Sequence, residues 1–237
     1  STLGVVSGDR LGYFAYVAGT TNLAAAAGAL GAVTTAWLVI KKPDLSMMLN
    51  GVIAALVAVT AACGFVAPWA AIVIGAVAGT IAVLGVLFVE RIGIDDPIGA
   101  VAVHGMSGVW GTLATGIFAV PALASNLATG GGGLVYTGSL HQLGVQALGL
   151  LAVGVFTFSV SCSALWLMKV TFGIRVDEDV ETAGLDVSEH GMWGYPELYI
   201  PVPGGYGTES HGHLGVAHRH ELRARPATSA EPALESP

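Results

Sequence analysis

Few residues in this sequence have side chains that could do chemistry, and His104 is the most informative of them. It is the only His, Lys or Arg that lies well inside one of the long apolar stretches. A neutral imidazole offers one hydrogen-bond donor and one acceptor, so it can pass on a small polar molecule without adding a fixed charge. Two interpretations stay open: a polar relay, or a structural histidine bonded to the carbonyl of a neighbouring helix.

Two carboxylates precede this histidine. Asp95 and Asp96 stand directly before Pro97, and Asp96 is eight residues ahead of His104. Aspartate at the beginning of a helix accepts hydrogen bonds from free amides and complements the helix dipole. Helix capping is therefore the plain interpretation of Asp95 and Asp96. Asp96 could in addition attract a cation at the inner mouth of a pore, and the two roles are compatible.

The remaining reactive side chains favour neither a metal site nor an enzyme. Cys63 and Cys162 lie in apolar runs, where a thiol behaves as a small buried hydrophobe. No nucleophile, base and orienting group occur together, and the Gly-rich stretch 130–133 lacks the strand and helix of a phosphate loop. We expect no enzymatic activity and no cofactor. Four tail histidines have spacings that could hold a metal, but we expect none or only adventitious binding: His211, His213, His218 and His220.

The elements that position these residues are predicted by composition. Of the 237 residues, 54% are hydrophobic and only 11% are charged, and the mean hydropathy is +0.72. This balance disfavours a soluble protein and predicts an all-α integral membrane protein. The net charge of -7 comes entirely from the tail that starts at Asp177, so it does not indicate a nucleic-acid partner.

Five stretches are long and apolar enough to cross a bilayer core, which takes ~20 helical residues. They run over about 13–40, 46–66, 70–90, 97–120 and 140–172. We expect a transmembrane domain over 1–173, a cytoplasmic tail over 174–200 and a disordered end over 201–237. Gly75 and Gly79 form a small-xxx-small pair, which predicts close helix packing.

The orientation follows from the basic residues of the short loops, which mark the cytoplasmic side of a membrane. Lys41 with Lys42, Arg91, and Lys169 with Arg175 agree only if the N-terminus lies outside and the tail lies inside. Entered from Asp96, the fourth stretch places His104 roughly 12 Å deep. The midplane of a ~30 Å core lies near 15 Å, so His104 is expected near mid-membrane. At that depth a functional role is the first hypothesis for an ionisable residue.

The beginning of the chain predicts a piece of a longer protein or a processed product. It has no initiator Met, and residues 1–10 lack the basic start and apolar middle of a signal peptide.

Several motifs together resemble one family. Asp95-Asp96-Pro97, followed by His104-Gly105-Met106-Ser107-Gly108-Val109-Trp110-Gly111-Thr112, resembles the late pore helix of the ammonium transporters. Further blocks that are similar to this family occur in order: Thr21 to Gly28, Asn50-Gly51 through Thr60 to Val66, and the tail segment Gly184 to Gly191. The resemblance runs over about residues 1–195. It implies the second of two inverted five-helix repeats plus the final long helix, with the first repeat missing.

The resemblance also implies roles for individual residues. His104 would be one of two pore histidines, with its partner in the missing half, and Ala100 would line the path below it. Asp96, with Asp95, would belong to the inner vestibule, and Ser1 would belong to the outer recruitment site. The cytoplasmic regulatory tail would include Gly184, Asp186 and His190.

As a family member the protein would transport ammonium or ammonia as a homotrimer in the plasma membrane. Its tail could meet a signalling protein of the PII type. The sequence departs from the family at Met192-Trp193 and at Ala36-Trp37, and neither change touches the path. The alternative is a non-conducting fragment or an ammonium-sensing membrane protein.

Overall fold

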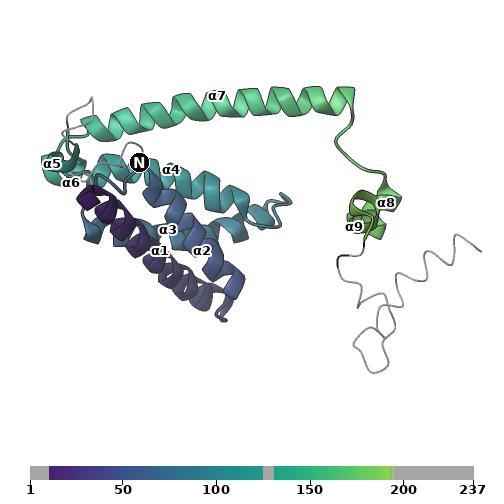
Figure 1. Cartoon of the computed structure of the whole chain (residues 1–237), viewed down its shortest axis with the longest axis horizontal. Helices are drawn as coiled ribbons and strands as arrows, with labels where there is room; N and C mark the ends of the chain where they lie inside the picture. The colour runs from purple at the N-terminus through teal and green to yellow at the C-terminus, as the bar shows by residue number, and fades with distance from the viewer. Residues whose placement is uncertain (1–10, 125–130, 193, 195–237) are drawn as a thin grey trace, which may run out of the picture. The chain divides into compact units, whose positions relative to one another are not determined.

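The computed structural model describes residues 11–124, 131–192 and 194. The chain divides into two compact units, residues 1–162 and 163–237, and each is considered by itself. The first unit holds the helices that bear on His104, and the second holds the described part of the tail (Figure 1).

The described residues are mostly helical. Their one recorded strand pairing is an isolated bridge between Val66 and Ala119. The elements in order are α1 (Leu11–Ile40), α2 (Leu45–Thr60), α3 (Pro68–Arg91), the π-helix η2 (Val101–Met106), α4 (Ser107–Phe118), α5 (Pro121–Ala124), α6 (Leu134–Thr137), α7 (His141–Thr171), α8 (Glu178–Ala183) and α9 (Leu185–His190).

Three of the described helices are long and apolar enough to cross a membrane. They are Gly12–Ile40, Pro68–Arg91 and His141–Thr171, and α2 is a shorter apolar helix. The all-helical prediction is confirmed at this level. The division of the chain into five spans, tail and disordered end stays a prediction, and residues 201–237 lie outside the described range.

The ends of these helices follow local rules. The carboxylate of Asp44 accepts a hydrogen bond from Met47 N at 2.9 Å and caps the start of α2. Pro68 opens α3, where its missing N–H has no helical partner to lose. At the other end of α3, Gly93 has φ 78°. The Ile94 amide reaches back to Val89 O at 3.2 Å, the pattern by which a left-handed glycine ends a helix.

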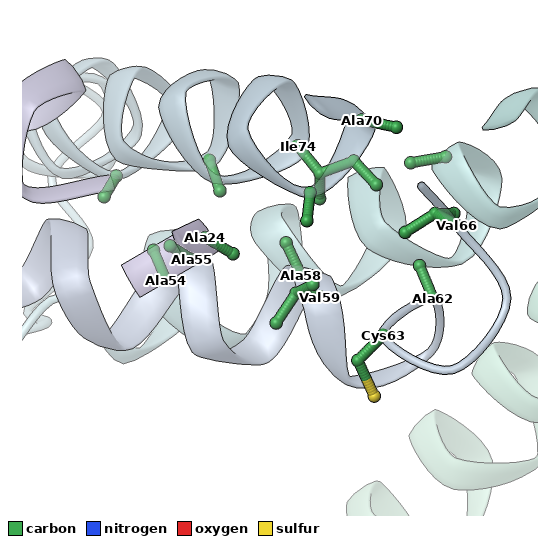
Figure 2. Packing of buried hydrophobic residues seen from close by; sticks show 14 of the residues in the cluster. Ala24, Ala54, Ala55, Ala58, Val59, Ala62, Cys63, Val66, Ala70 and Ile74 are labelled. Atoms are coloured by element: carbon green, nitrogen blue, oxygen red, sulfur yellow. The ribbon is translucent and has the colours of Figure 1, made fainter. Parts of the chain in front are cut away.

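The core of the first unit lies where α1, α2 and α3 meet (Figure 1). Its buried residues are mostly alanine, and Figure 2 shows Ala24 of α1 and Ala55 and Ala58 of α2 in the same cluster as Ile74 of α3. A Cβ on Gly75 would run into the backbone of Ala24, and one on Gly79 would run into the backbone of Gly28. The predicted close packing at Gly75 and Gly79 is therefore confirmed. Ala24 contacts Gly75 and Gly28 contacts Gly79, so contacts advance in the same direction along both helices and α1 and α3 run parallel. The helix that connects them in sequence, α2, runs antiparallel to both.

Polar side chains inside this unit bond to backbone or to one another. Thr20 donates to Cys63 O at 2.8 Å, and Tyr16 donates to Val66 O at 2.7 Å. Both bonds tie α1 to the turn that follows α2. Cys63 is buried as expected, whereas Cys162 is exposed on α7. The expectation of burial was wrong for Cys162 because no described helix covers that part of α7.

Candidate functional site

The segment before His104 is a tight turn rather than the beginning of a helix. We expected a helical stretch from residue 97, but η2 begins at Val101. Gly99 has φ 73°, a left-handed conformation that favours glycine. A Cβ there would lie 2.8 Å from Val86 Cγ2 and 3.1 Å from Asn50 Nδ2. Asn50 also donates to Ile98 O at 3.3 Å, so α2 and α3 together hold this turn.

Asp96 closes the turn onto the helix. One carboxylate oxygen accepts from Ala100 N and the other from Val101 N, each at 2.8 Å. Hydrogen bonds from amides to an ionised carboxylate are stronger than bonds between neutral groups. Asp95 is exposed and forms no hydrogen bond with the described residues. The capping geometry that we expected for both aspartates is therefore seen at Asp96.

His104 lies in the π-helix. The amide of Ser107 donates to Ala102 O, five residues earlier, and this wider spacing defines η2. Single π-turns within α-helices are rare and occur frequently at functional sites. Neither hydropathy nor residue spacing predicted this turn. It surrounds His104, the residue that the sequence singles out as a candidate for chemistry.

The two sides of η2 differ sharply in burial. Ala102 and Val103 are buried against the bundle, whereas His104 and Gly105 are exposed. The imidazole of His104 forms no hydrogen bond with a described residue. The alternative interpretation, a structural histidine bonded to a helix carbonyl, therefore finds no support within the described chain.

The surface around His104 is apolar. Val101, one turn before it, and Val109, one turn after it, are each 43% exposed. Ala100, which the family resemblance placed below His104, is half-buried. Val109 and Leu113 also line an apolar groove of about 680 Å³, whose other wall is formed by residues of α7 such as Leu151 and Phe158. A polar imidazole on such a surface can exchange hydrogen bonds with a small solute.

The tail unit contains two short helices that are joined by Gly184, whose φ is 100°. The carboxylate of Asp186, near the start of α9, accepts a hydrogen bond from Gly194 N at 2.9 Å. This bond ties Gly194, which follows α9, back to the start of the helix. His190 ends α9 and is exposed. Arg175 and Glu181 form an exposed ion pair at 2.8 Å. The guanidinium of Arg175 hydrogen-bonds to Glu181 and lowers the pKa of that carboxyl.

Ser1, Trp193 and the tail histidines lie outside the described residues. Within the described ranges, no group of three His, Cys, Asp or Glu side chains could hold a metal ion. Asp96 lies just before η2 and His104 lies within it, both in the first unit, whereas Gly184, Asp186 and His190 belong to the other unit.

Known proteins resemble this chain in sequence and in fold. An ammonium transporter of Archaeoglobus fulgidus is 43% identical over 187 residues, which is 77% of this chain and 39% of the relative. The ammonium transporter of Bacillus subtilis is 36% identical over 190 residues, 80% of this chain and 46% of the relative. The chain thus spans less than half the length of these two relatives.

Solved structures agree. A structure described as a sensor Amt protein superposes with a TM-score of 0.66 at 34% identity, over 75% of this chain and 42% of that one. Mep2 of Saccharomyces cerevisiae gives a TM-score of 0.64 at 31% identity, over 70% of this chain and 38% of that one. The model of the Ammonium Transporter Family matches residues 4–195. The chain is a multi-pass membrane protein, and it belongs to the ammonium transporter family.

Proposed function

We propose that this chain forms one half of a path for ammonium or ammonia across the membrane, with His104 lining that path. The observation that carries the proposal is the placement of His104 on the open, apolar side of η2, without a hydrogen-bond partner among the described residues. A cation cannot enter hydrocarbon at low cost. Transport as ammonia, handed along by neutral imidazoles, avoids that cost.

The surrounding residues take roles that follow from this arrangement. Ala100 lies one turn before His104 and borders the path on its cytoplasmic side. Asp96, with its carboxylate bound to two amides, holds the turn at the inner mouth, and Asp95 presents a free charge to the vestibule. The family resemblance, rather than this arrangement, assigns Ser1 to the outer recruitment site. This assignment has the N-terminus outside and the tail in the cytoplasm of the plasma membrane.

The family also suggests how the whole protein assembles. The chain would supply the last five spans of a five-plus-five-plus-one architecture, drawn from the second inverted repeat and the final long helix. Three such proteins would form a homotrimer with one path in each subunit. The tail unit with Gly184, Asp186 and His190 would contact a regulator at the cytoplasmic face, such as a signalling protein of the PII type.

A second candidate is an ammonium-sensing or non-conducting membrane protein. One observation favours it: the fold similarity to a structure titled as a sensor Amt protein. In that case the helices pack together and the solute binds at His104, but no continuous path crosses the membrane.

Flux measurements on the 237-residue chain separate the two candidates. The chain is reconstituted in liposomes that contain a pH-sensitive dye, and ammonia entry is followed after an ammonium gradient is applied. We expect flux above that of empty liposomes, a loss of at least tenfold in His104→Ala, and no change in His141→Ala, which removes an exposed histidine from the start of α7. Flux equal to that of empty liposomes would overturn transport by the 237-residue chain itself and favour the sensor for this chain.

A further inference from the structure

The turn that carries His104 contains one residue more than a regular helix would, and this changes the direction of the imidazole. Ser107, Gly111 and Thr115 lie four residues apart on the buried face of α4. His104 is three residues before Ser107 and seven before Gly111. At about 100° per residue, seven residues fall within about 20° of two full turns. A regular α-helix would therefore place His104 on the buried face, against α2 and α3.

The π-turn moves it away from that face. Because Ser107 N bonds to Ala102 O rather than to the carbonyl of Val103, residues before the turn are displaced by one position, or about 100° around the axis. The burial pattern agrees with this displacement. Ala102 and Val103 occupy the buried face, and His104 and Gly105 lie on the exposed side.

The hydroxyl of Ser107 provides a second hydrogen bond at the same place. Ser107 is fully buried, and its Oγ donates to Ala102 O at 3.0 Å. Hydroxyls in the regular part of α4 behave differently: Thr112 and Thr115 each donate to the carbonyl four residues earlier, at 2.9 and 3.2 Å. The Ser107 hydroxyl instead matches the five-residue spacing of the π-turn, and Ala102 O accepts two hydrogen bonds there.

Close helix contacts before and after the π-turn fix the two ends of this segment. The helix therefore cannot slide along its axis to remove the extra residue. Before the turn, a Cβ on Gly85 of α3 would lie 2.8 Å from Ala102 Cβ, so these helices are in close contact. After the turn, Gly111 packs directly on the backbone of Ala58 in α2. The segment between the two contacts must accommodate one residue more than an α-helix would need.

We propose that Ser107 is a positioning residue for His104: its hydroxyl holds the π-turn, and the π-turn keeps the imidazole on the open face of the bundle. The value of this orientation rests on the proposed function, because only a transported or sensed solute would meet the imidazole there. The orientation itself can be measured without transport.

The test measures how accessible residue 104 is. In a Cys63→Ala, Cys162→Ala background, a single cysteine is placed at position 104 or at position 105, and the rate of N-ethylmaleimide labelling is measured in detergent. The quantity of interest is the ratio of the rate at 104 to the rate at 105, since residue 105 stays exposed in either helix form. We expect Ser107→Ala to lower this ratio at least threefold, because residue 104 turns toward the buried face.

Two further variants make the result specific. Ser107→Thr keeps the hydroxyl and should restore the ratio. Thr115→Val removes a buried hydroxyl that bonds with the ordinary four-residue spacing, so the ratio should stay as in the parent. If Ser107→Ala does not give a monodisperse protein, Ser107→Gly is measured in its place. An unchanged ratio in the variant without the hydroxyl overturns the proposal, as does an equal fall in Thr115→Val.

Liposome flux separates this inference from the proposed function. A lowered labelling ratio in a chain that shows no flux would leave Ser107 as a positioning residue and remove the transport role. Flux that depends on His104, together with an unchanged labelling ratio, would support the transport role and remove Ser107 as a positioning residue.

Discussion

The contact between α1 and α3 makes a quantitative prediction at Gly75. In Gly75→Ala the new methyl group would meet the carbonyl oxygen of Ala24 and lie 2.7 Å from its carbonyl carbon and 2.8 Å from its Cα. Non-bonded carbon atoms prefer about 3.5–4.0 Å, so the two helices must separate by about 1 Å. Overpacking of this kind costs about 1–3 kcal/mol, and the better helix propensity of alanine offsets up to about 1 kcal/mol of it.

We therefore expect Gly75→Ala to lose about 1–2 kcal/mol, which lowers Tm by roughly 2–8 °C for a chain of this length. The assay is thermal unfolding in detergent, followed by far-ultraviolet circular dichroism. Gly19→Ala is the matched control on α1, because a Cβ at Gly19 would have nothing within 4 Å. Its Tm should be unchanged or slightly raised. Equal Tm values for the two variants would refute the close-packing argument.

Two further predictions concern carboxylates. Asp96→Asn keeps one acceptor in place of two carboxylate oxygens, so it should lower the stability in detergent by about 1–2 kcal/mol, whereas Asp95→Asn should change it little; equal losses would contradict the capping geometry. In the tail, Arg175 lowers the pKa of Glu181, so the stabilising contribution of the pair is present above the ordinary glutamate pKa and is lost as pH falls through the lowered pKa. Arg175→Gln should raise the Glu181 titration midpoint measured by carbon-13 NMR, and an unmoved midpoint would show that the pair does not interact in solution.

The long helices were the predictable part of this fold, for a simple physical reason. Apolar composition over ~20 residues is enough to favour a helix in a bilayer, where each backbone group must bond within its own segment. In the structure, local residues fix ends of two helices: Asp44 stands where α2 begins, Pro68 where α3 begins and Gly93 where α3 ends. The glycines at 75 and 79 predicted a close contact, although not with which helix.

The candidate site was predictable in identity but not in geometry. His104 could be singled out because an imidazole is rare inside an apolar stretch. Its direction could not be predicted, since it depends on one extra residue between contacts that α2 and α3 make with the same helix. Gly99 and Ser107 belong to this arrangement, yet glycine and serine are so common in membrane helices that neither carries a signal by itself. The role of Asp96 was open for a different reason: helix capping and a place in the vestibule both call for a carboxylate.

The alanine- and glycine-rich contact of α1, α2 and α3 has a consequence for how easily these helices associate. Ordering a buried Leu or Met side chain costs roughly 0.5–2 kcal/mol of rotamer entropy, whereas Ala and Gly have no rotamers to lose. The backbone entropy of glycine is lost earlier, when each segment becomes helical in the membrane. Helices that meet through residues such as Ala24, Ala55 and Gly75 thus associate almost without side-chain ordering, which matters in a solvent that provides no hydrophobic drive for their contact.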